Sequence, residues 1–479
     1  MDLVGPIRSV KPFASAEFAS VDFLALAWWA TPEARWLTAI ALLGLALRVV
    51  WVLYAARTPR ELHDPLFYLI YGTQIAEGNG YRLLDGQPTA YFPVGYSAAL
   101  GAVFSLVMHT PIPDNLIKAA AFFQVFLSVA TVVLAYHVAR RLFGATVGLL
   151  TALWIAVFPN LIYHTGALLT ETLFNFLVMA ALLALVWSGW PRGRLEPRRL
   201  VVFGVLLGVS ALVRPISLLF LPILLVVLFW AGAGWRHAAA QTGIALIATA
   251  AVIMPWSIRN FIVMDALVII STNLGDDLCI GHYPAAPGHF ALPEQCFSSQ
   301  YDDLRRPEYE TRRNDDNTRR AISFAVHHPR AELLLLKRKA YWLWNHDHDG
   351  AWAVESYGDD PFIDPNLRTA LYRVADIFFF TTISLGGLGL AGFVLAPRDP
   401  RRIFTLLALL AFAGIPLVFF TDARFHMPVM PFISIAAAWA LVAALRNAPR
   451  LAARMGAHSG VEVAEGKRPV ADEDALQDA

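Results

Sequence analysis

Ten long apolar runs constrain the fold of this chain more than any other feature of its sequence. A helix that crosses a membrane needs roughly 20 apolar residues. The runs occupy residues 35–56, 115–138, 145–163, 168–188, 200–214, 216–235, 239–257, 372–395, 403–421 and 428–446. Only 16% of the 479 residues are charged, against about 25% in a typical soluble domain. The sequence therefore predicts an all-α polytopic membrane protein with about 10 transmembrane helices.

The distribution of positive charge predicts which ends of these helices share a side. Short cytoplasmic loops collect Lys and Arg. The five basic clusters are at 140–141, 190–199, 236–237, 397–402 and 446–454. They share one side only if the eleventh apolar run, 93–110, does not fully cross. We therefore predict that 93–110 lies in or dips into the outer interface, with both termini in the cytoplasm.

This topology divides the chain into five parts. A cytoplasmic N-terminal segment, which lacks the pattern of a secretory signal, covers 1–34, and a membrane module covers 35–257. The first outer loop, 57–113, lies within that module and is expected to carry interfacial helices. A large outer loop covers 258–371, membrane helices cover 372–446, and a polar, disordered cytoplasmic tail covers 447–479. The formal net charge of +1 argues against nucleic acid as a partner.

The two cysteines, Cys279 and Cys296, both fall in the large outer loop. A pair of cysteines outside the membrane fits a disulfide in an oxidising compartment, and two unrelated free thiols are the alternative. The His/Asp tract at 346–349 is expected to be solvated in an exposed loop rather than to bind a metal. No cofactor is predicted, and the sequence does not indicate a divalent metal.

Several polar side chains are predicted to converge at the outer ends of the helices. They are Asp64, Lys118, His164, Glu171, Arg214, Arg259, Arg424 and His426. Polar groups at the edge of lipid are costly, so a set at one depth is a functional hypothesis by default. Carboxylates and cations together suit transfer of a sugar from a lipid phosphate. Arginine can hold the departing phosphate, and one carboxylate can take the proton of the acceptor hydroxyl.

Each of these residues also has a simpler interpretation. Asp64 could be the N-cap of a helix that starts at Pro65. Glu171 could be an interfacial residue or the partner of a nearby arginine, and Arg424 could pair locally with Asp422. Arg214 and Arg259 could anchor in headgroups. The two histidines, 164 and 426, could serve packing or hydrogen bonding alone.

An ordered set of motifs resembles the GT-C superfamily of membrane glycosyltransferases. The segment HDPLFYLIYGTQIAEGNGY…PTAYFPVGYSAALGAVFSL resembles the first outer loop of these enzymes. Its likeness is to bacterial members of the protein O-mannosyltransferase and aminoarabinose-transferase group. The further motifs are RRLFG, TETLF, VRPISLLFLP, PWSIRN, STNLGDDLCIGHYPAAPG and RFHMPVMPF, and the resemblance covers roughly 35–440. Two departures, Asp64-Pro65 and Phe92-Pro93, leave the acceptor side of the site open.

The resemblance implies a GT-C fold and a reaction on the outer face of the bacterial cytoplasmic membrane. A sugar would pass from a polyprenyl-phosphate donor, with inversion, to a protein, lipid or glycan acceptor. Asp64 matches the family's base and Glu171 a second acidic residue. The matching phosphate-binding residues are Arg259 and Arg424, with Lys118 and Arg214 as further candidates. The predicted acceptor and sugar pocket contains His63, Tyr68, Tyr81, Tyr96, His164 and His426.

Two other functions fit a membrane protein of this kind. A transporter or flippase of a lipid-linked saccharide would place charged residues in mid-membrane along a polar path. A scaffold protein of the envelope would tolerate substitution at Asp64, Glu171 and Arg259 together. The sequence concentrates charge at the outer helix ends, which favours an enzyme that works from one face.

Overall fold

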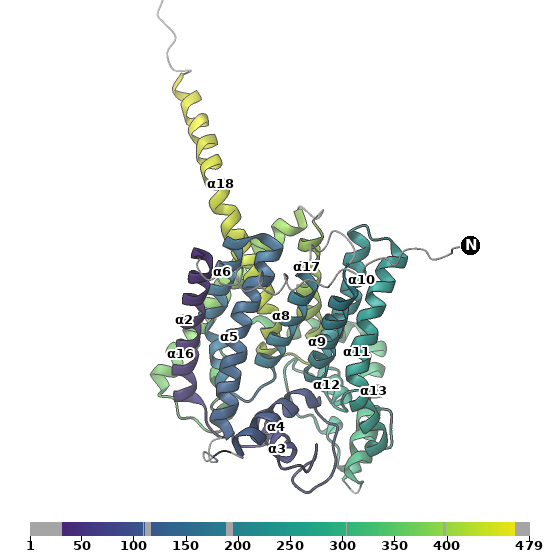
Figure 1. Cartoon of the computed structure of the whole chain (residues 1–479). Helices are drawn as coiled ribbons and strands as arrows, with labels where there is room; N and C mark the ends of the chain where they lie inside the picture. The colour runs from purple at the N-terminus through teal and green to yellow at the C-terminus, as the bar shows by residue number, and fades with distance from the viewer. Residues whose placement is uncertain are drawn as a thin grey trace, which may run out of the picture.

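A computed structural model gives the fold as a bundle of helices (Figure 1). It describes residues 31–108, 110, 116–187, 195–302, 304–395 and 399–464, with backbone alone for 448–464. Within this part of the chain no extended strand is present, and only an isolated bridge joins Arg82 and Pro88. The prediction of an all-α membrane fold is confirmed.

Six helical segments of the described chain are long and apolar enough to cross a membrane. They are α2 (Pro32–Ala55), α5 (Leu116–Phe143), α11 (Trp235–Met264), α16 (Pro365–Leu395), α17 with η6 (Pro400–Val418), and η7 with the first part of α18 (Ala423–Asn447). Four further predicted runs contain shorter helices: α6 (Ala145–Ala156), α8 (Glu171–Val186), α9 (Pro197–Val213) and α10 (Phe220–Trp230). Each predicted run thus forms helix, although a count of about ten crossings is not confirmed.

The third predicted span is broken rather than continuous. Helix α6 ends at Ala156, and α7 (Pro159–Tyr163) with η1 (His164–Gly166) continues after a bend of 58°. Pro159 has no N–H and disfavours helical backbone in the residue before it, which explains the break. Pro159 cannot donate the α-helical hydrogen bond to Ile155 O, which accepts a long bond from Phe158 N at 3.4 Å at this break.

A buried arginine in the first span binds the carbonyls at the end of α6. Arg48 of α2 donates to Ala156 O at 2.7 Å and Ile155 O at 3.1 Å, and its Nε donates to Ser128 Oγ at 2.7 Å. The side chain is fully buried. An arginine at membrane depth is tolerated when it faces protein and satisfies backbone groups. Arg48 therefore stabilises the break in the third span.

Close helix contacts at glycine hold the bundle together. A Cβ on Gly204 of α9 would run into Ala245 O of α11, and a Cβ on Gly389 of α16 would run into Ala436 O of α18. Small residues at such crossings let two backbones approach, which is how membrane helices pack without a hydrophobic driving force. The same pairs, α9 with α11 and α16 with α18, are among the most extensive contacts of the fold.

The elements of both outer loops gather at one end of the bundle, which we call the loop end (Figure 1). The first loop forms α3 (Asp64–Ala76) and α4 (Val94–Met108). At about 1.5 Å per residue the 15 residues of α4 span roughly 22 Å, less than the 30 Å of a hydrocarbon core. Helix α4 packs against α3 at the loop end, and the placement of 93–110 in the outer interface stays a prediction.

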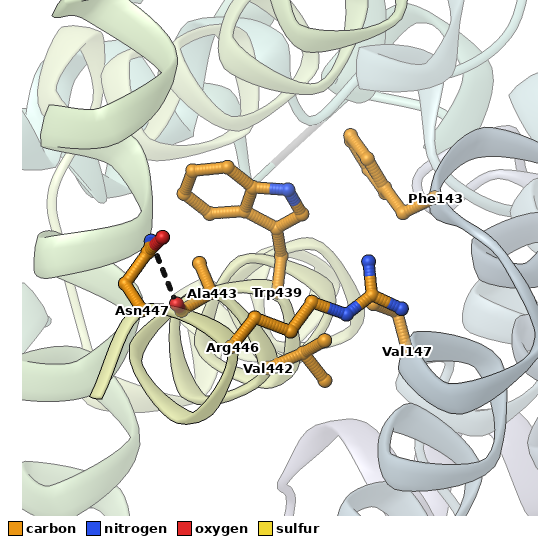
Figure 2. A pocket seen from close by; sticks show the side chains of 7 residues that line it. All are labelled: Phe143, Val147, Trp439, Val442, Ala443, Arg446 and Asn447. Carbon is orange, nitrogen blue, oxygen red and sulfur yellow. Dashed lines mark hydrogen bonds between the residues drawn. The ribbon is translucent and has the colours of Figure 1, made fainter. Parts of the chain in front are cut away.

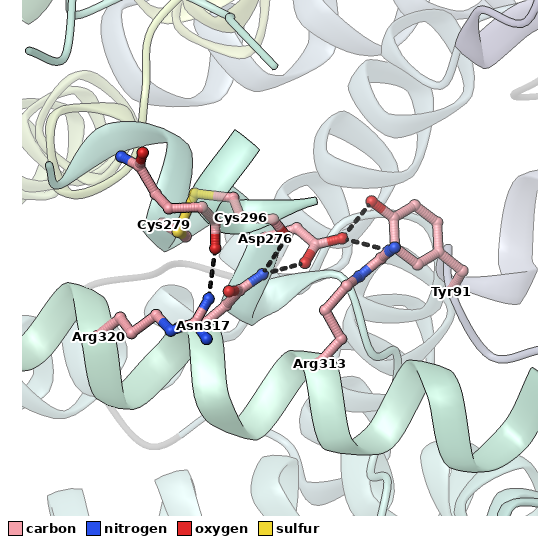
Figure 3. Close-up of a disulfide and its surroundings, with 8 residues drawn as sticks. Tyr91, Asp276, Cys279, Cys296, Arg313, Asn317 and Arg320 are labelled. Atoms are coloured by element: carbon pink, nitrogen blue, oxygen red, sulfur yellow. Dashed lines mark hydrogen bonds and ion pairs between the residues drawn. A yellow bond between two sulfur atoms is a disulfide. The ribbon is translucent and has the colours of Figure 1, made fainter. Parts of the chain in front are cut away.

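The large loop folds into a set of helices and 3-10 turns. They are α12 (Leu274–Gly281), α13 (Arg306–His327), α14 (Pro329–Trp344) and α15 (Asp349–Ala353), with the 3-10 turns η3 (Glu294–Cys296), η4 (Ser299–Tyr301) and η5 (Ser356–Gly358). A disulfide joins Cys279 of α12 to Cys296, with their Cα atoms 5.9 Å apart (Figure 3). This link fixes α12 to the turn η3.

Two buried carboxylates of the large loop hold the first outer loop. Glu310 of α13 accepts hydrogen bonds from Thr89 Oγ1 at 2.5 Å and Ala90 N at 3.0 Å. Asp276 of α12 accepts from the hydroxyl of Tyr91 at 2.8 Å and from Arg313 at 2.6 Å (Figure 3). A buried charge is stable only with such partners. The chain just before α4 is therefore held in place by the large loop.

The opposite end of the bundle differs from the prediction in one respect. Helix α18 runs from Met430 to Ala464 and projects beyond the bundle (Figure 1). Residues 447–464 are thus helical where the sequence predicted a disordered tail. The many Ala and Arg residues there are good helix formers, so the last span continues past its apolar part. The rest of the predicted tail, 465–479, and residues 1–30 of the N-terminal segment lie outside the described residues.

Candidate active site

The centre of the loop end is an ion pair between Asp64 and Arg424. Asp64 is the first residue of α3, and its Oδ2 lies 2.7 Å from Nη2 of Arg424. Arg424 lies in η7 (Ala423–Val429), the 3-10 turn that precedes α18. The Asp64 side chain keeps 27% of its surface exposed and Arg424 keeps 16%. The pair is therefore partly accessible to a ligand.

A second ion pair, between Glu171 and Arg214, is buried beside the first. Glu171 opens α8 and is fully buried, and its Oε1 contacts Nη2 of Arg214, the residue that follows α9. Nε of Arg214 also donates to Thr170 Oγ1 at 2.6 Å. The Phe425 ring joins the two pairs, because its centroid lies 5.2 Å from the Arg424 guanidinium and 6.0 Å from that of Arg214. Both pairs thus belong to one site.

Tyr357 of the large loop completes the surroundings of Arg424. Nη1 of Arg424 donates to the Tyr357 hydroxyl at 3.1 Å. Tyr357 has a φ of 56°, in the left-handed region that a residue with a side chain rarely adopts. Burial raises the pKa of Tyr357, so the phenol stays neutral. Arg424 is held by a carboxylate on one side and by a neutral hydroxyl on the other.

An aromatic wall from the first outer loop borders the ion pairs. Tyr68 lies one turn after Asp64 on α3, and its ring meets that of Tyr96 edge to face at 5.1 Å. Burial, and next the charge of Asp64, raise the pKa of Tyr68. Tyr96 in turn donates to Gln124 at 3.2 Å, and Gln124 donates to Ala167 O at 2.7 Å, just before Glu171. The wall therefore connects α3 to the segment that carries the buried pair.

Three other predicted residues make no hydrogen bond or ion pair with the members of the two ion pairs. Tyr81 donates to Phe92 O at 3.0 Å and supports the first outer loop. His63, beside Asp64, lies 2.6 Å from Asp359 and edge to face with the Tyr357 ring at 5.1 Å. Lys118, near the start of α5, is half-buried and forms no hydrogen bond or ion pair with the residues that the structure describes.

Arg259 donates hydrogen bonds to backbone carbonyls and takes no part in the two ion pairs. Its guanidinium donates to Thr89 O at 2.8 Å and to Tyr81 O at 2.9 Å, and it lies 4.8 Å from the Trp256 ring. Both carbonyls belong to the first outer loop, so Arg259 holds the same stretch as Glu310. The structure therefore does not bring Arg259 into contact with Asp64 or Arg424.

Both predicted histidines are buried and make specific hydrogen bonds. His164 Nδ1 contacts Asn160 O at 2.9 Å, while its Nε2 has no partner among the described residues. His426 contacts Leu343 O through Nδ1 at 2.7 Å and Asp347 through Nε2 at 2.8 Å. The prediction of a solvated His/Asp tract was wrong, because Asp347 is fully buried and Asp349 nearly so. The tract packs against the membrane helices instead of lying in water.

Two of the simpler interpretations also fail. The N-cap of α3 is His63, so Asp64 is already helical and leaves its carboxylate free for Arg424. Asp422 does not pair with Arg424, and its Oδ1 accepts from Phe290 N at 3.5 Å. Glu171, by contrast, is the partner of a nearby arginine, which was one of its alternatives.

Sequence reasoning missed several residues of this site. Tyr357, Phe425 and Asn160 carry no charge; Phe425 lies within the motif RFHMPVMPF, but Tyr357 and Asn160 lie in none of the motifs quoted above. Burial, and then the charges of Asp276 and Asp64, raise the pKa of Asp277 of α12, whose carboxylate accepts from Asn273 at 2.9 Å. The motif STNLGDDLCIG was the available signal for it. No cluster of three His, Cys, Asp or Glu side chains that could hold a metal occurs in the described chain.

A cavity of about 340 Å³ lies elsewhere, at the end opposite the ion pairs (Figure 2). Phe143, Val147, Trp439 and Arg446 are among its lining residues, contributed by α5, α6 and α18. This cavity includes none of the predicted site residues, so the candidate site is defined by the ion pairs alone.

Comparison with known proteins supports the predicted fold. Residues 98–258, about a third of the chain, match the family described as dolichyl-phosphate-mannose-protein mannosyltransferase. No curated protein matches the sequence. The oligosaccharyltransferase AglB from Archaeoglobus fulgidus, solved with an inhibitory peptide and a dolichol-phosphate, is similar with a TM-score of 0.52 and 14% identity. That match covers 93% of this chain and 53% of AglB.

Two more solved structures extend the comparison. The apo form of the same archaeal enzyme matches with a TM-score of 0.53 and 15% identity over 93% of this chain and 54% of that one. The chain thus spans about half the length of these archaeal proteins. ArnT from Cupriavidus metallidurans, bound to undecaprenyl phosphate, matches at 13% identity over 88% of this chain and 80% of ArnT. Its TM-score of 0.38 is too low to establish a shared fold. The chain is a membrane protein with the fold of the GT-C glycosyltransferases, the superfamily that its sequence resembles.

Proposed function

We propose that the chain is an inverting glycosyltransferase that moves a sugar from a polyprenyl-phosphate donor to an acceptor hydroxyl at the loop end. The observation that carries this proposal is the Asp64–Arg424 pair, a partly exposed carboxylate and an arginine held together at a distance of 2.7 Å. The dolichol-phosphate bound by AglB supports a lipid-linked donor. The loop end would then be the outer face of a bacterial cytoplasmic membrane.

Arg424 is the proposed binding residue for the donor phosphate. A guanidinium can hold two phosphate oxygens at once, and the bound phosphate would compete with Asp64 for it. The exchange frees the carboxylate beside the sugar. Arg214, which is already paired with Glu171, would add positive potential without leaving its partner.

The proposed reaction needs one proton transfer. The acceptor oxygen attacks the anomeric carbon of the sugar from the face opposite the phosphate, and its proton passes to Asp64. The bond between that carbon and the phosphate oxygen breaks, and the lipid phosphate leaves with the electron pair. Arg424 stabilises the charge that develops on the phosphate. No acid is needed on the leaving side, because phosphate leaves as an anion.

The transporter alternative has no observation in its favour. Arg48 is a fully buried charged residue within a span, and its guanidinium is bonded to protein groups of α5 and α6. It therefore does not line a polar path.

Transfer of label from a panel of radiolabelled polyprenyl-phosphate sugars tests the proposal. Membranes with the wild-type protein should pass label to an acceptor, and membranes with Asp64→Asn should lose roughly 10²–10⁴-fold of that rate. The reacting donor would identify the sugar. Transport of lipid-linked sugar without covalent transfer would overturn the proposal, and equal rates for both proteins would remove Asp64 from its role as base.

A further inference from the structure

His426 lies in the same 3-10 turn as Arg424, two residues further along the chain. Its ring is fully buried and stacks on Phe379, with centroids 4.6 Å apart, and on Trp344, at 5.5 Å. Nδ1 lies 2.7 Å from Leu343 O, and Nε2 lies 2.8 Å from Asp347 Oδ1. Ring stacking and two hydrogen bonds thus fix His426, and with it the turn that presents Arg424.

Asp347 connects this turn to the broken third span. The same atom, Asp347 Oδ1, accepts from Asn160 Nδ2 at 2.5 Å, and Asn160 Oδ1 accepts from Gly350 N at 2.8 Å. The backbone N–H of Asp347 donates to Asp376 of α16 at 2.8 Å. A Cβ on Gly350 would lie 2.6 Å from His164 Nδ1, so this crossing leaves no room for a side chain. Asp347 therefore joins α7, α16 and η7.

The protons of this cluster can be assigned from its acceptors. Leu343 O only accepts, so Nδ1 of His426 must carry a proton. The contact between Nε2 and the carboxylate then needs one more proton, held by either partner. An asparagine at 347 could not reproduce this arrangement. Asn160 Nδ2 and His426 Nε2 meet the same oxygen of residue 347. An amide oxygen at that position could accept from Asn160, but it carries no proton to share with His426 Nε2.

We propose that Asp347 is a positioning residue for the transfer reaction, acting through His426 on Arg424. It fixes the turn Ala423–Val429 so that the guanidinium stands between Asp64 and Tyr357. This inference rests on the proposed function, because it assigns Arg424 to the donor phosphate. The phosphate then meets an arginine whose position is already set, as efficient transfer requires.

The first test is the steady-state kinetics of Asp347→Asn. A displaced Arg424 should lower kcat by roughly 10²-fold, the loss expected for a misplacement of about 1 Å. The KM for the lipid-phosphate donor should rise, and the KM for the acceptor should stay unchanged. A purely structural defect would reduce the amount of active protein and leave both KM values as they are. His348→Gln is the matched control, since His348 bonds to Asp376 and not to η7.

A double-mutant cycle with Arg424→Lys isolates the path of the effect. If Asp347 acts through Arg424, Asp347→Asn should cost little further activity in the Arg424→Lys background. Losses that multiply would overturn the inference, as would wild-type KM and kcat in Asp347→Asn. A wild-type protein that transfers no sugar would overturn the proposed function and this role together. Transfer at the wild-type rate and with the wild-type donor KM in Asp347→Asn would overturn this role alone.

A second variant covers the case in which Asp347→Asn does not fold. The double substitution Asp347→Leu with His426→Phe replaces both members of the pair by apolar groups, so that neither is left charged and buried without the other. It keeps an aromatic ring between Trp344 and Phe379 but removes the link to Asn160. The same rise in donor KM is expected, and a wild-type donor KM in the folded variant would overturn the inference.

Discussion

Arg424 binds Asp64 across 360 residues of sequence, with Nη2 2.7 Å from Oδ2. Asp64 follows the first span and Arg424 precedes the last, so this contact closes the bundle at the loop end. Both residues are also partly exposed. The ion pair thus links the chain after the first span to the chain before the last span, and it remains partly accessible to a substrate.

Substitution of Arg424 by lysine should reduce transfer sharply. A lysine keeps the charge but has a single ammonium, so it cannot contact Asp64 and Tyr357 through separate nitrogens. We expect a loss of roughly 10²-fold in kcat/KM for the donor, as for loss of one charge-stabilising donor. Arg446→Lys at the opposite end is the control, and an equal loss there would contradict the assignment.

Glu171→Gln should lower the free energy of unfolding of the protein. Glu171 is fully buried, and its loss leaves the Arg214 charge without a partner. Removing one member of a buried pair costs about 3–5 kcal/mol. Thermal unfolding in detergent measures this, with Glu308→Gln as the control because Glu308 forms an exposed pair with Arg312. Glu171→Gln combined with Arg214→Met should recover much of the loss, and no recovery would contradict the explanation.

Glu310→Gln should loosen the first outer loop. The carboxylate accepts from Thr89, Ala90, Thr272 and Arg306, and a neutral amide can accept on one atom only. Hydrogen exchange of residues 81–91 should therefore become faster, while exchange in α5 stays unchanged. Unchanged exchange at 81–91 would mean that Arg259 and Asp276 hold the loop without Glu310.

Lys339 should give the protein a measurable pH dependence. Its burial lowers the pKa to about 8, from 10.5. Between these values the unfolded chain binds a proton that the folded chain does not, so folding stability rises with pH there. Below pH 8 both states are protonated, and burying the charge destabilises the fold by at most about 3 kcal/mol.

Lys339→Met removes that contribution. The variant should unfold at a higher temperature than wild type at pH 7 and should gain less stability between pH 8 and 10. Lys337→Met, on the exposed face of the same helix, should follow wild type throughout. A wild-type pH profile in Lys339→Met would show that Lys339 does not titrate in this range.

The sequence predicted the all-α membrane fold and the gathering of four charged side chains at one end of the bundle. Apolar runs located the helices, and the shared end of Asp64, Glu171, Arg214 and Arg424 followed from where these runs end. The sequence did not predict the partner of Arg424, because Asp422 is near Arg424 in sequence whereas Asp64 is near it only in space. Such long-range pairing depends on how the spans pack, which local hydropathy does not record.

The sequence also failed to predict which polar side chains are buried. The His/Asp tract has the composition of a solvated loop, yet Asn160 and His426 supply the hydrogen bonds that allow Asp347 to be buried. Arg48 was overlooked for a similar reason, since its carbonyl partners exist only because Pro159 breaks the third span. In both cases the compensating group lies on another helix and becomes visible only in three dimensions.

The separation of Asp64 from Arg424 sets the order in which this protein can become functional during its synthesis. The first outer loop leaves the ribosome early and then waits for Glu310, some 220 residues later, before its own backbone is held. The ion pair must wait still longer, until the turn before α18 has been made. A nascent chain that stops short of this turn would contain most of the bundle and no complete site.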